Sequence, residues 1–268
     1  MISLQPVPLS ARASAQLIKW QASIDGLGTY DAKVAEAATK FKSRNTRKNK
    51  TFDEVKVALE KMCCGARRCC YCEDSAADEV EHISPKNLFP QRVFDWTNYI
   101  YACGPCNGPK NNRYAYISNA GTREEFVRGR GDPIKPPPAG QDALIDPRSE
   151  NPLDFMQLDL AGTFRFVAND ADPLVKCRAE WTIEVLDLNK PVLTRGRESA
   201  YFFIESALLR YAREKAQNSP GAVLRRTKAE ILRTAHPTVF LEMQRSRVAD
   251  QAFQNIPEAR AWRFEPSP

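Results

Sequence analysis

Apolar residues recur at helical spacing near both ends of the chain, whereas the middle holds shorter apolar runs between turn-forming residues. At the N-terminal end, this pattern predicts helices over residues 10–24, 31–42 and 51–62. The third of these begins with a capping-box pattern, in which Thr51 and Glu54 satisfy free amides at the helix start. We therefore expect a helical N-terminal region.

The middle of the chain favours strands. Residues 78–83 and 98–102 form short segments, the second rich in aromatic and β-branched residues, and each suits one strand. Pro85 and Pro90 force a loop between them, and residues 107–114 suit a short helix. This region is thus predicted to run in the order strand, loop, strand, helix.

The C-terminal half begins with a long connection over residues 119–152, where glycines and a run of three prolines favour a path over the surface. A hairpin and several helices are expected after it. The predicted ranges are 156–160 and 163–167 for the hairpin, and 179–186, 193–214, 222–234 and 238–253 for the helices. In the longest helix, apolar spacing predicts a buried face made by Phe203, Ile204, Leu208 and Leu209.

Together these elements predict an α+β fold that is mostly helical. Its expected divisions are a helical region over 1–62, a β-containing core over 63–118, and a loop, hairpin and helical region over 119–268. With 268 residues, 43% of them hydrophobic, the chain can bury a sizeable core in one or two compact units. The sequence has no apolar run near the roughly 20 residues of a membrane span and no signal-peptide pattern, so we expect a cytoplasmic protein without membrane contact.

The net charge of +6 modestly favours polyanionic partners such as nucleic acid. Its distribution is uneven, because residues 40–50 contain six basic residues and no acidic one. This segment could neutralise phosphates if the fold presents it near a site, or it could be a solvated loop between helices.

Two Cys-x-x-Cys pairs, Cys69/Cys72 and Cys103/Cys106, indicate chemistry in the central region. Four thiolates at this spacing suit a tetrahedral zinc site that joins two distant segments. A disulfide framework is the poorer interpretation, because it is typical of small secreted chains. Unmetallated buried thiols or redox chemistry are the alternatives to zinc. The other cysteines, Cys63, Cys64, Cys70 and Cys177, are expected to pack as small apolar residues, although Cys70 could replace a neighbour as a ligand.

Between the cysteine pairs lie Glu81-His82 and Pro85-Lys86, then residues 95–98, and the second pair continues into Asn107 and Lys110. This order of motifs resembles the HNH endonuclease family. The resemblance implies a ββα-metal finger, with the four-cysteine zinc site as an accessory, embedded between the helical regions. Residues 143–148, 151–154 and 179–189 further resemble the C-terminal half of HNH proteins from Septu-type and retron-associated bacterial antiphage systems.

The resemblance also implies roles for single residues. His82 matches the general base, Asn98 the residue that ties the loop and orients the histidine, and Glu81 a metal ligand. Asn107 falls where many family members carry their final histidine, and carboxylate and amide oxygens favour a catalytic magnesium or manganese ion. Three basic residues are expected to contact phosphates or to be solvated at the surface: Lys86, Lys110 and Arg113.

The leading interpretation is a metal-dependent endonuclease that hydrolyses DNA or, as the second choice, RNA, as the effector of an antiphage system. Its alternative is a zinc-stabilised nucleic-acid-binding or adaptor module without cleavage. A thiol oxidoreductase is disfavoured, because neither cysteine pair sits in a thioredoxin-like pattern. His236, between two predicted helices, is expected to be a loop or cap residue. The chain lacks the phosphate-binding loop of an ATPase, and the resemblance implies a separate ATPase partner.

Overall fold

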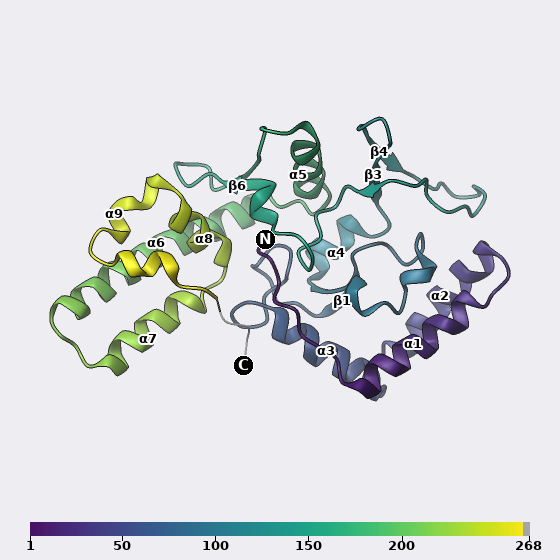
Figure 1. Ribbon diagram of the computed structural model, residues 1–268, viewed down its shortest axis with the longest axis horizontal. Helices are drawn as coiled ribbons and strands as arrows, with labels where there is room; N and C mark the ends of the chain where they lie inside the picture. Colours follow the sequence, from purple (N-terminus) through teal and green to yellow (C-terminus); the bar gives the residue numbers. More distant parts are fainter. Residues whose placement is uncertain (265–268) are drawn as a thin grey trace.

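The computed structural model describes residues 1–264 and has an α+β fold with short sheets and many helices. In Figure 1, helices α1 and α2 lie toward one end of the molecule and α6 to α9 toward the other, with α3, β1 and α4 between them. The predicted fold class is therefore confirmed at this level. The third predicted region extends to residue 268, and residues 265–268 lie outside the described part.

The elements have the following bounds. The helices are α1 (Ala11–Asp25), α2 (Tyr30–Arg44), α3 (Lys50–Met62), α4 (Gly104–Lys110), α5 (Pro173–Val185), α6 (Pro191–Ala216), α7 (Gly221–Leu232), α8 (Pro237–Arg245) and α9 (Asp250–Phe253). The strands are β1 (Glu79–His82), β2 (Tyr99–Ala102), β3 (Tyr114–Ile117), β4 (Arg123–Phe126), β5 (Gln141–Asp142), β6 (Met156–Leu158) and β7 (Phe166–Ala168). Short 3-10 turns lie at Pro90–Arg92, Trp96–Asn98, Pro152–Asp154, Arg247–Ala249 and Pro257–Ala261.

The N-terminal helices form where the apolar periodicity predicts them. Ser10 caps α1, and its hydroxyl accepts a hydrogen bond from the amide of Ala13 at 3.1 Å. Helix α3 differs in its start, because Asn49 and not Thr51 is the cap: its amide oxygen accepts bonds from the Thr51 and Phe52 amides. The predicted capping box is therefore wrong, since Asn49 already serves these amides.

The central unit has the predicted order of strand, loop, strand and helix. Strand β1 pairs antiparallel with β2, with His82 opposite Tyr99, and α4 follows β2. The predicted helix over 107–114 is shifted, because α4 begins at Gly104 and ends where Asn111 adopts a φ of 37°. Residues 114–117 instead form β3, which pairs with β4 and β5 in a sheet that the sequence did not predict.

The C-terminal region departs from prediction in several places, among them α5, which begins at Pro173 and not at residue 179. Phe203 and Leu209 of α6 are 46% and 52% exposed, so only Ile204 and Leu208 of the predicted apolar face are buried. The predicted helix over 238–253 is divided, because α8 ends at Arg245 and Ser246 adopts an extended conformation. The predicted hairpin is present as β6 and β7, antiparallel to each other.

One apolar cluster joins these parts, and it runs from Leu4 in the N-terminal segment through β2 to Trp262. Helix α3 packs on β2, and α1 packs on α3, so the N-terminal helices support the central unit directly. Within residues 1–264, no helix combines the length and the apolar composition that crossing a membrane requires.

Candidate metal centre and active site

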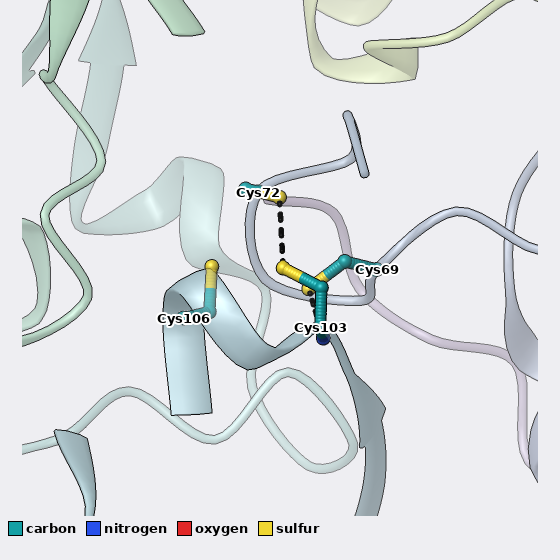
Figure 2. A group of neighbouring side chains, drawn as sticks. All are labelled: Cys69, Cys72, Cys103 and Cys106. Atoms are coloured by element: carbon teal, nitrogen blue, oxygen red, sulfur yellow. Dashed lines mark hydrogen bonds between the residues drawn. The ribbon is translucent and has the colours of Figure 1, made fainter. Parts of the chain in front are cut away.

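The four cysteines of the two Cys-x-x-Cys pairs meet in one buried cluster. Their sulfur atoms all lie within 4.8 Å of one another. Cys69 and Cys72 come from the loop before β1, whereas Cys103 precedes α4 and Cys106 lies in its first turn (Figure 2). The Cys72 and Cys103 sulfurs are 3.8 Å apart. Sulfurs bound to one zinc at about 2.3 Å in a tetrahedron lie about 3.8 Å apart, so the cluster fits the predicted ion.

Backbone amides also favour thiolates at this cluster. The sulfur of Cys69 accepts hydrogen bonds from the amides of Tyr71 at 3.4 Å and Cys103 at 3.3 Å. Hydrogen bonds among the four cysteines lower the pKa of Cys72 and Cys103 and raise the pKa of Cys69 and Cys106. Thiolates buried together require a cation, and zinc is an ion that four cysteine sulfurs can hold. Cys70 is not one of the four, because its sulfur lies 3.8 Å from that of Cys63.

A polar pocket of about 350 Å³ lies beside this cluster. It is bounded by the C-terminal end of α2, by β1, by the loop after β1 and by the C-terminal end of α4. Glu81, His82 and Asn107 all line it, and so does Lys86. The fold therefore brings the main predicted site residues to one cavity from two separate segments of the chain, β1 with its following loop and α4.

His82 is held with one defined nitrogen available for chemistry. Its side chain is buried between the rings of Phe41 and Tyr99, and its Nε2 lies 3.0 Å from the carbonyl oxygen of Val93. A carbonyl oxygen only accepts hydrogen bonds, so Nε2 carries the proton and Nδ1 is the basic nitrogen. Burial, followed by the charge of Lys86, lowers the pKa of His82 to about 3. The imidazole is consequently neutral at pH 7.

Asn98 is fully buried and joins both ends of the loop that follows β1. Its side-chain nitrogen donates to the carbonyl oxygens of Ser84 and Arg92, each at 3.0 Å, and its oxygen accepts from the Ser84 amide at 2.8 Å. Arg92 directly precedes Val93, the residue that holds His82. The amide of Asn98 therefore fixes the loop that orients the imidazole.

Glu81 of β1 and Lys110 of α4 form a buried ion pair. The ammonium of Lys110 lies 2.6 Å from a carboxylate oxygen of Glu81 and donates to the carbonyl oxygen of His82 at 2.8 Å. The Lys110 side chain is only 1% exposed. This placement differs from the predicted phosphate contact, because the ammonium faces the protein interior. Lys110 instead balances the charge of Glu81.

Glu79 is a pocket residue that the sequence reasoning missed. Its carboxylate accepts a hydrogen bond from the side-chain nitrogen of Asn107 at 2.5 Å, and both residues line the pocket. Residues two apart in a strand share a face, so the spacing of Glu79 and Glu81 was the available signal. The Asn107 side-chain oxygen is the remaining polar atom of this amide, and it can only accept hydrogen bonds or bind a cation.

The predicted basic contacts have different environments. Lys86 lines the pocket, with its ammonium 5.5 Å from the centre of the Phe41 ring, and burial lowers the pKa of Lys86. The guanidinium of Arg113 is already paired with Glu125 at 2.9 Å and Glu184 at 2.8 Å. The basic segment 40–50 is mostly exposed and reaches the pocket at its middle, since Phe41 and Asn45 line it.

His236 lies away from this pocket, at the N-terminal end of α8, as expected of a cap residue. Its Nε2 lies 3.2 Å from a carboxylate oxygen of Asp74, and burial lowers the pKa of His236. This contact connects α8 to the turn that follows Cys72.

Comparison with known proteins finds a short similarity to one bacterial protein. A stretch of 61 residues is 39% identical to the Septu protein PtuB of Bacillus thuringiensis, which is 21% of this chain and 23% of that protein. The match therefore covers less than a quarter of the relative's own length. No protein-family model matches the chain, and no solved structure matches it either.

The pocket combines a proton acceptor, side-chain amides, the carboxylates of Asp78, Glu79 and Glu81, and the ammonium groups of Lys56 and Lys86. A neutral imidazole can take a proton from water, and oxygen atoms of this kind are ligands for hard divalent cations. The four-cysteine cluster is next to the pocket, because its Cys106 directly precedes the pocket residue Asn107 in α4. Such an arrangement can activate water next to a bound anion.

Proposed function

We propose that this protein is a metal-dependent endonuclease of the HNH type that hydrolyses phosphodiester bonds in nucleic acid, with DNA favoured over RNA. The observation that carries the proposal is the convergence of Glu81, His82 and Asn107 on one pocket beside the four-cysteine cluster. The similarity to a Septu protein supports a role as the effector of an antiphage defence system.

His82 is the proposed general base. Its hydrogen bond to Val93 leaves Nδ1 to accept a proton from water, and its lowered pKa keeps this nitrogen free at neutral pH. The negative charge of a bound phosphodiester raises the pKa of a neighbouring imidazole and makes it a stronger base. Asn98 acts through the loop that presents Val93.

Glu81 and Asn107 would hold the catalytic magnesium or manganese ion. Their donor set fits such an ion, because a carboxylate and an amide oxygen are hard ligands and because both residues line the pocket. A divalent ion bound there supplies positive charge that stabilises the phosphate and the leaving oxygen. Glu79 orients Asn107 through its hydrogen bond to the amide nitrogen.

One observation favours the alternative function, a zinc-stabilised nucleic-acid-binding module without cleavage. The carboxylate of Glu81 is paired with Lys110, and a cation must compete with that ammonium for it. A cleavage assay separates the two functions, because the binding module retains nucleic acid without hydrolysing it in any metal.

The decisive experiment incubates the protein with plasmid DNA and with single-stranded RNA in magnesium, in manganese and in chelator. Cleavage in the metals, absent in chelator, is expected from the wild type and lost in His82→Ala. His82→Asn is the second variant, because it preserves more of the buried volume. The His82 variant used for the comparison should have the same zinc content and circular dichroism spectrum as the wild type. Full activity in a folded His82 variant would refute the base assignment.

The resemblance to Septu-type proteins also leads us to propose a separate ATPase protein as the partner in the cytoplasm. The chain itself lacks the phosphate-binding loop such an activity needs. Affinity purification of the tagged protein from a host that expresses its neighbouring genes should recover an ATPase at fixed stoichiometry. Full defence by this chain in a host without any such partner would contradict the proposal.

A further inference from the structure

A second hollow, of about 330 Å³, adjoins the His82 pocket. The two share a wall, because Asn111 and Asn112 line both of them. They also share the loop after β1, in which Lys86 lines the first and Leu88 lines the second. A ligand longer than one phosphate can therefore pass from one hollow to the other between this loop and the turn that ends α4.

Arg128 gives the second hollow an available positive charge. Its guanidinium is held on one side, where Nη2 donates to the carbonyl oxygen of Asn87 at 3.1 Å. Its Nη1 is buried and has no hydrogen-bond partner in the described part of the chain, although the residue lines the hollow. The residue lies at the wall of the hollow, where an anion would interact favourably with the guanidinium charge.

Most other groups in this hollow suit a nucleotide, and the carboxylate of Glu125, which also lines it, is paired with Arg113. Arg113 lines it too, but two glutamates already pair with its guanidinium, so Arg128 is the better phosphate ligand. Beside Arg128 lie the ring of Phe126 and the side chain of Val127, which is 74% exposed. Apolar and aromatic side chains next to a cation are the usual surroundings of a stacked base on a bound strand.

The turn between the two hollows has an unusual backbone. Asn111 lies there with a φ of 37°, in a region that residues other than glycine rarely adopt. This conformation ends α4 and keeps Asn111 and Asn112 at the boundary of both hollows. Strained backbone of this kind is concentrated at binding and catalytic sites.

We propose that the second hollow is a binding subsite for the nucleotide next to the scissile phosphate of an extended nucleic-acid strand, with Arg128 as its phosphate ligand. This inference rests on the proposed function, because it takes the His82 pocket as the place of the scissile phosphate. It adds a substrate requirement: the strand must continue beyond the cleaved bond.

Binding and hydrolysis are measured separately to test it. A fluorescein-labelled oligonucleotide is titrated with the full-length protein in calcium, and the dissociation constant is followed from low to high salt. Arg128→Gln should weaken binding about tenfold and lower the slope of log K against log salt by about one, because one phosphate contact is lost. Arg130→Gln is the matched control, since Arg130 is exposed in the same segment and does not line the hollow.

Two further variants separate a loss of nucleic-acid binding from a folding defect in Arg128→Gln. Arg128→Lys keeps the charge and should retain the salt slope. Val127→Glu adds a negative charge at the hollow through an exposed side chain, and should weaken binding as Arg128→Gln does. An oligonucleotide affinity that is the same in Arg128→Gln, Val127→Glu and Arg130→Gln would overturn the subsite.

A small substrate distinguishes this inference from the proposed function. Hydrolysis of bis(p-nitrophenyl) phosphate tests the His82 pocket alone, because this small diester has no further nucleotide to place in the second hollow. A wild type that binds oligonucleotide through Arg128 but hydrolyses neither substrate would overturn the endonuclease and keep the binding site. A wild type that hydrolyses the small diester but shows no Arg128-dependent binding would overturn the binding subsite and keep the endonuclease.

Discussion

The ammonium of Lys110 lies 2.6 Å from the carboxylate of Glu81, and the two side chains are 1% and 9% exposed. Helix α4 supplies the lysine and strand β1 the glutamate, so this pair joins the two elements that form the base of the pocket. Each buried charge is stabilised by the other, because neither side chain is freely hydrated by water.

Replacing Lys110 by methionine should destabilise the protein by about 3–5 kcal/mol in chelator, because Glu81 is left buried and unpaired. Urea unfolding at pH 7.5 measures the change, with the exposed Lys42→Met as control. The double variant Glu81→Gln/Lys110→Met should recover part of the loss. Additive effects of the two single changes would show that the pair is not coupled.

The four-cysteine cluster should hold about one zinc per chain in the purified protein, measured by elemental analysis. Cys106→Ser should lower this content sharply, because three thiolates no longer complete the tetrahedral set. Cys177→Ser should not, since Cys177 lies outside the cluster. After strong chelation, amide exchange should accelerate over residues 69–106 before it does over α6 and α7. If chelation left the amide exchange rates over residues 69–106 unchanged, no structural ion would be present.

Asn98→Ala should cost about 3 kcal/mol of stability, because three hydrogen bonds of a fully buried amide are removed. Asn98→Asp keeps the acceptor of the Ser84 amide and loses both donated bonds. Urea unfolding measures both variants, and Asn169→Ala, whose side chain makes one exposed hydrogen bond, provides the control. A loss no larger than that of Asn169→Ala would contradict the role of Asn98 in holding the loop.

The lowered pKa of His82 makes stability depend on pH. Above about 6.5 the imidazole is neutral in both the folded and the unfolded chain, and its contribution is fully present. As the pH falls from about 6.5 toward 3, only the unfolded chain binds the proton, so stability is lost. From pH 7.5 to 5.5 the loss from this group should be about 1.4 kcal/mol. In urea unfolding, His82→Asn should lack this component, and an unchanged pH dependence in that variant would be evidence against a neutral buried imidazole.

Replacing Gly196 or Gly108 by alanine should change the free energy of unfolding in opposite directions, although both residues lie within helices. A Cβ at Gly196 would lie 2.6 Å from the Nε2 of the buried His236, so Gly196→Ala should destabilise by about 1–3 kcal/mol. A Cβ at Gly108 meets no atom within 4 Å, so Gly108→Ala should stabilise by about 0.5–1 kcal/mol. Thermal unfolding checks both, and a stabilised Gly196→Ala would show that His236 is free to move.

Local pattern was enough for several features of this protein. The spacing of apolar residues located most helices, because a face that recurs every three to four residues needs only neighbouring positions. The two Cys-x-x-Cys pairs predicted the buried four-cysteine cluster, since each pair forms a short turn of its own. Helix α4 was misplaced and strand β3 was not predicted, because the turn at Asn111 depends on a rare backbone conformation.

The sequence by itself determined the helical regions, the strand, loop, strand and helix order of the centre, and the cysteine ligand set. Only the tertiary structure decided which partner each charged or polar group takes: Glu81 with Lys110, Asn107 with Glu79, and His82 with Val93. These choices depend on contacts between residues far apart in the chain. In a buried pocket, such contacts outweigh local preference, because every polar group removed from water must find a partner there.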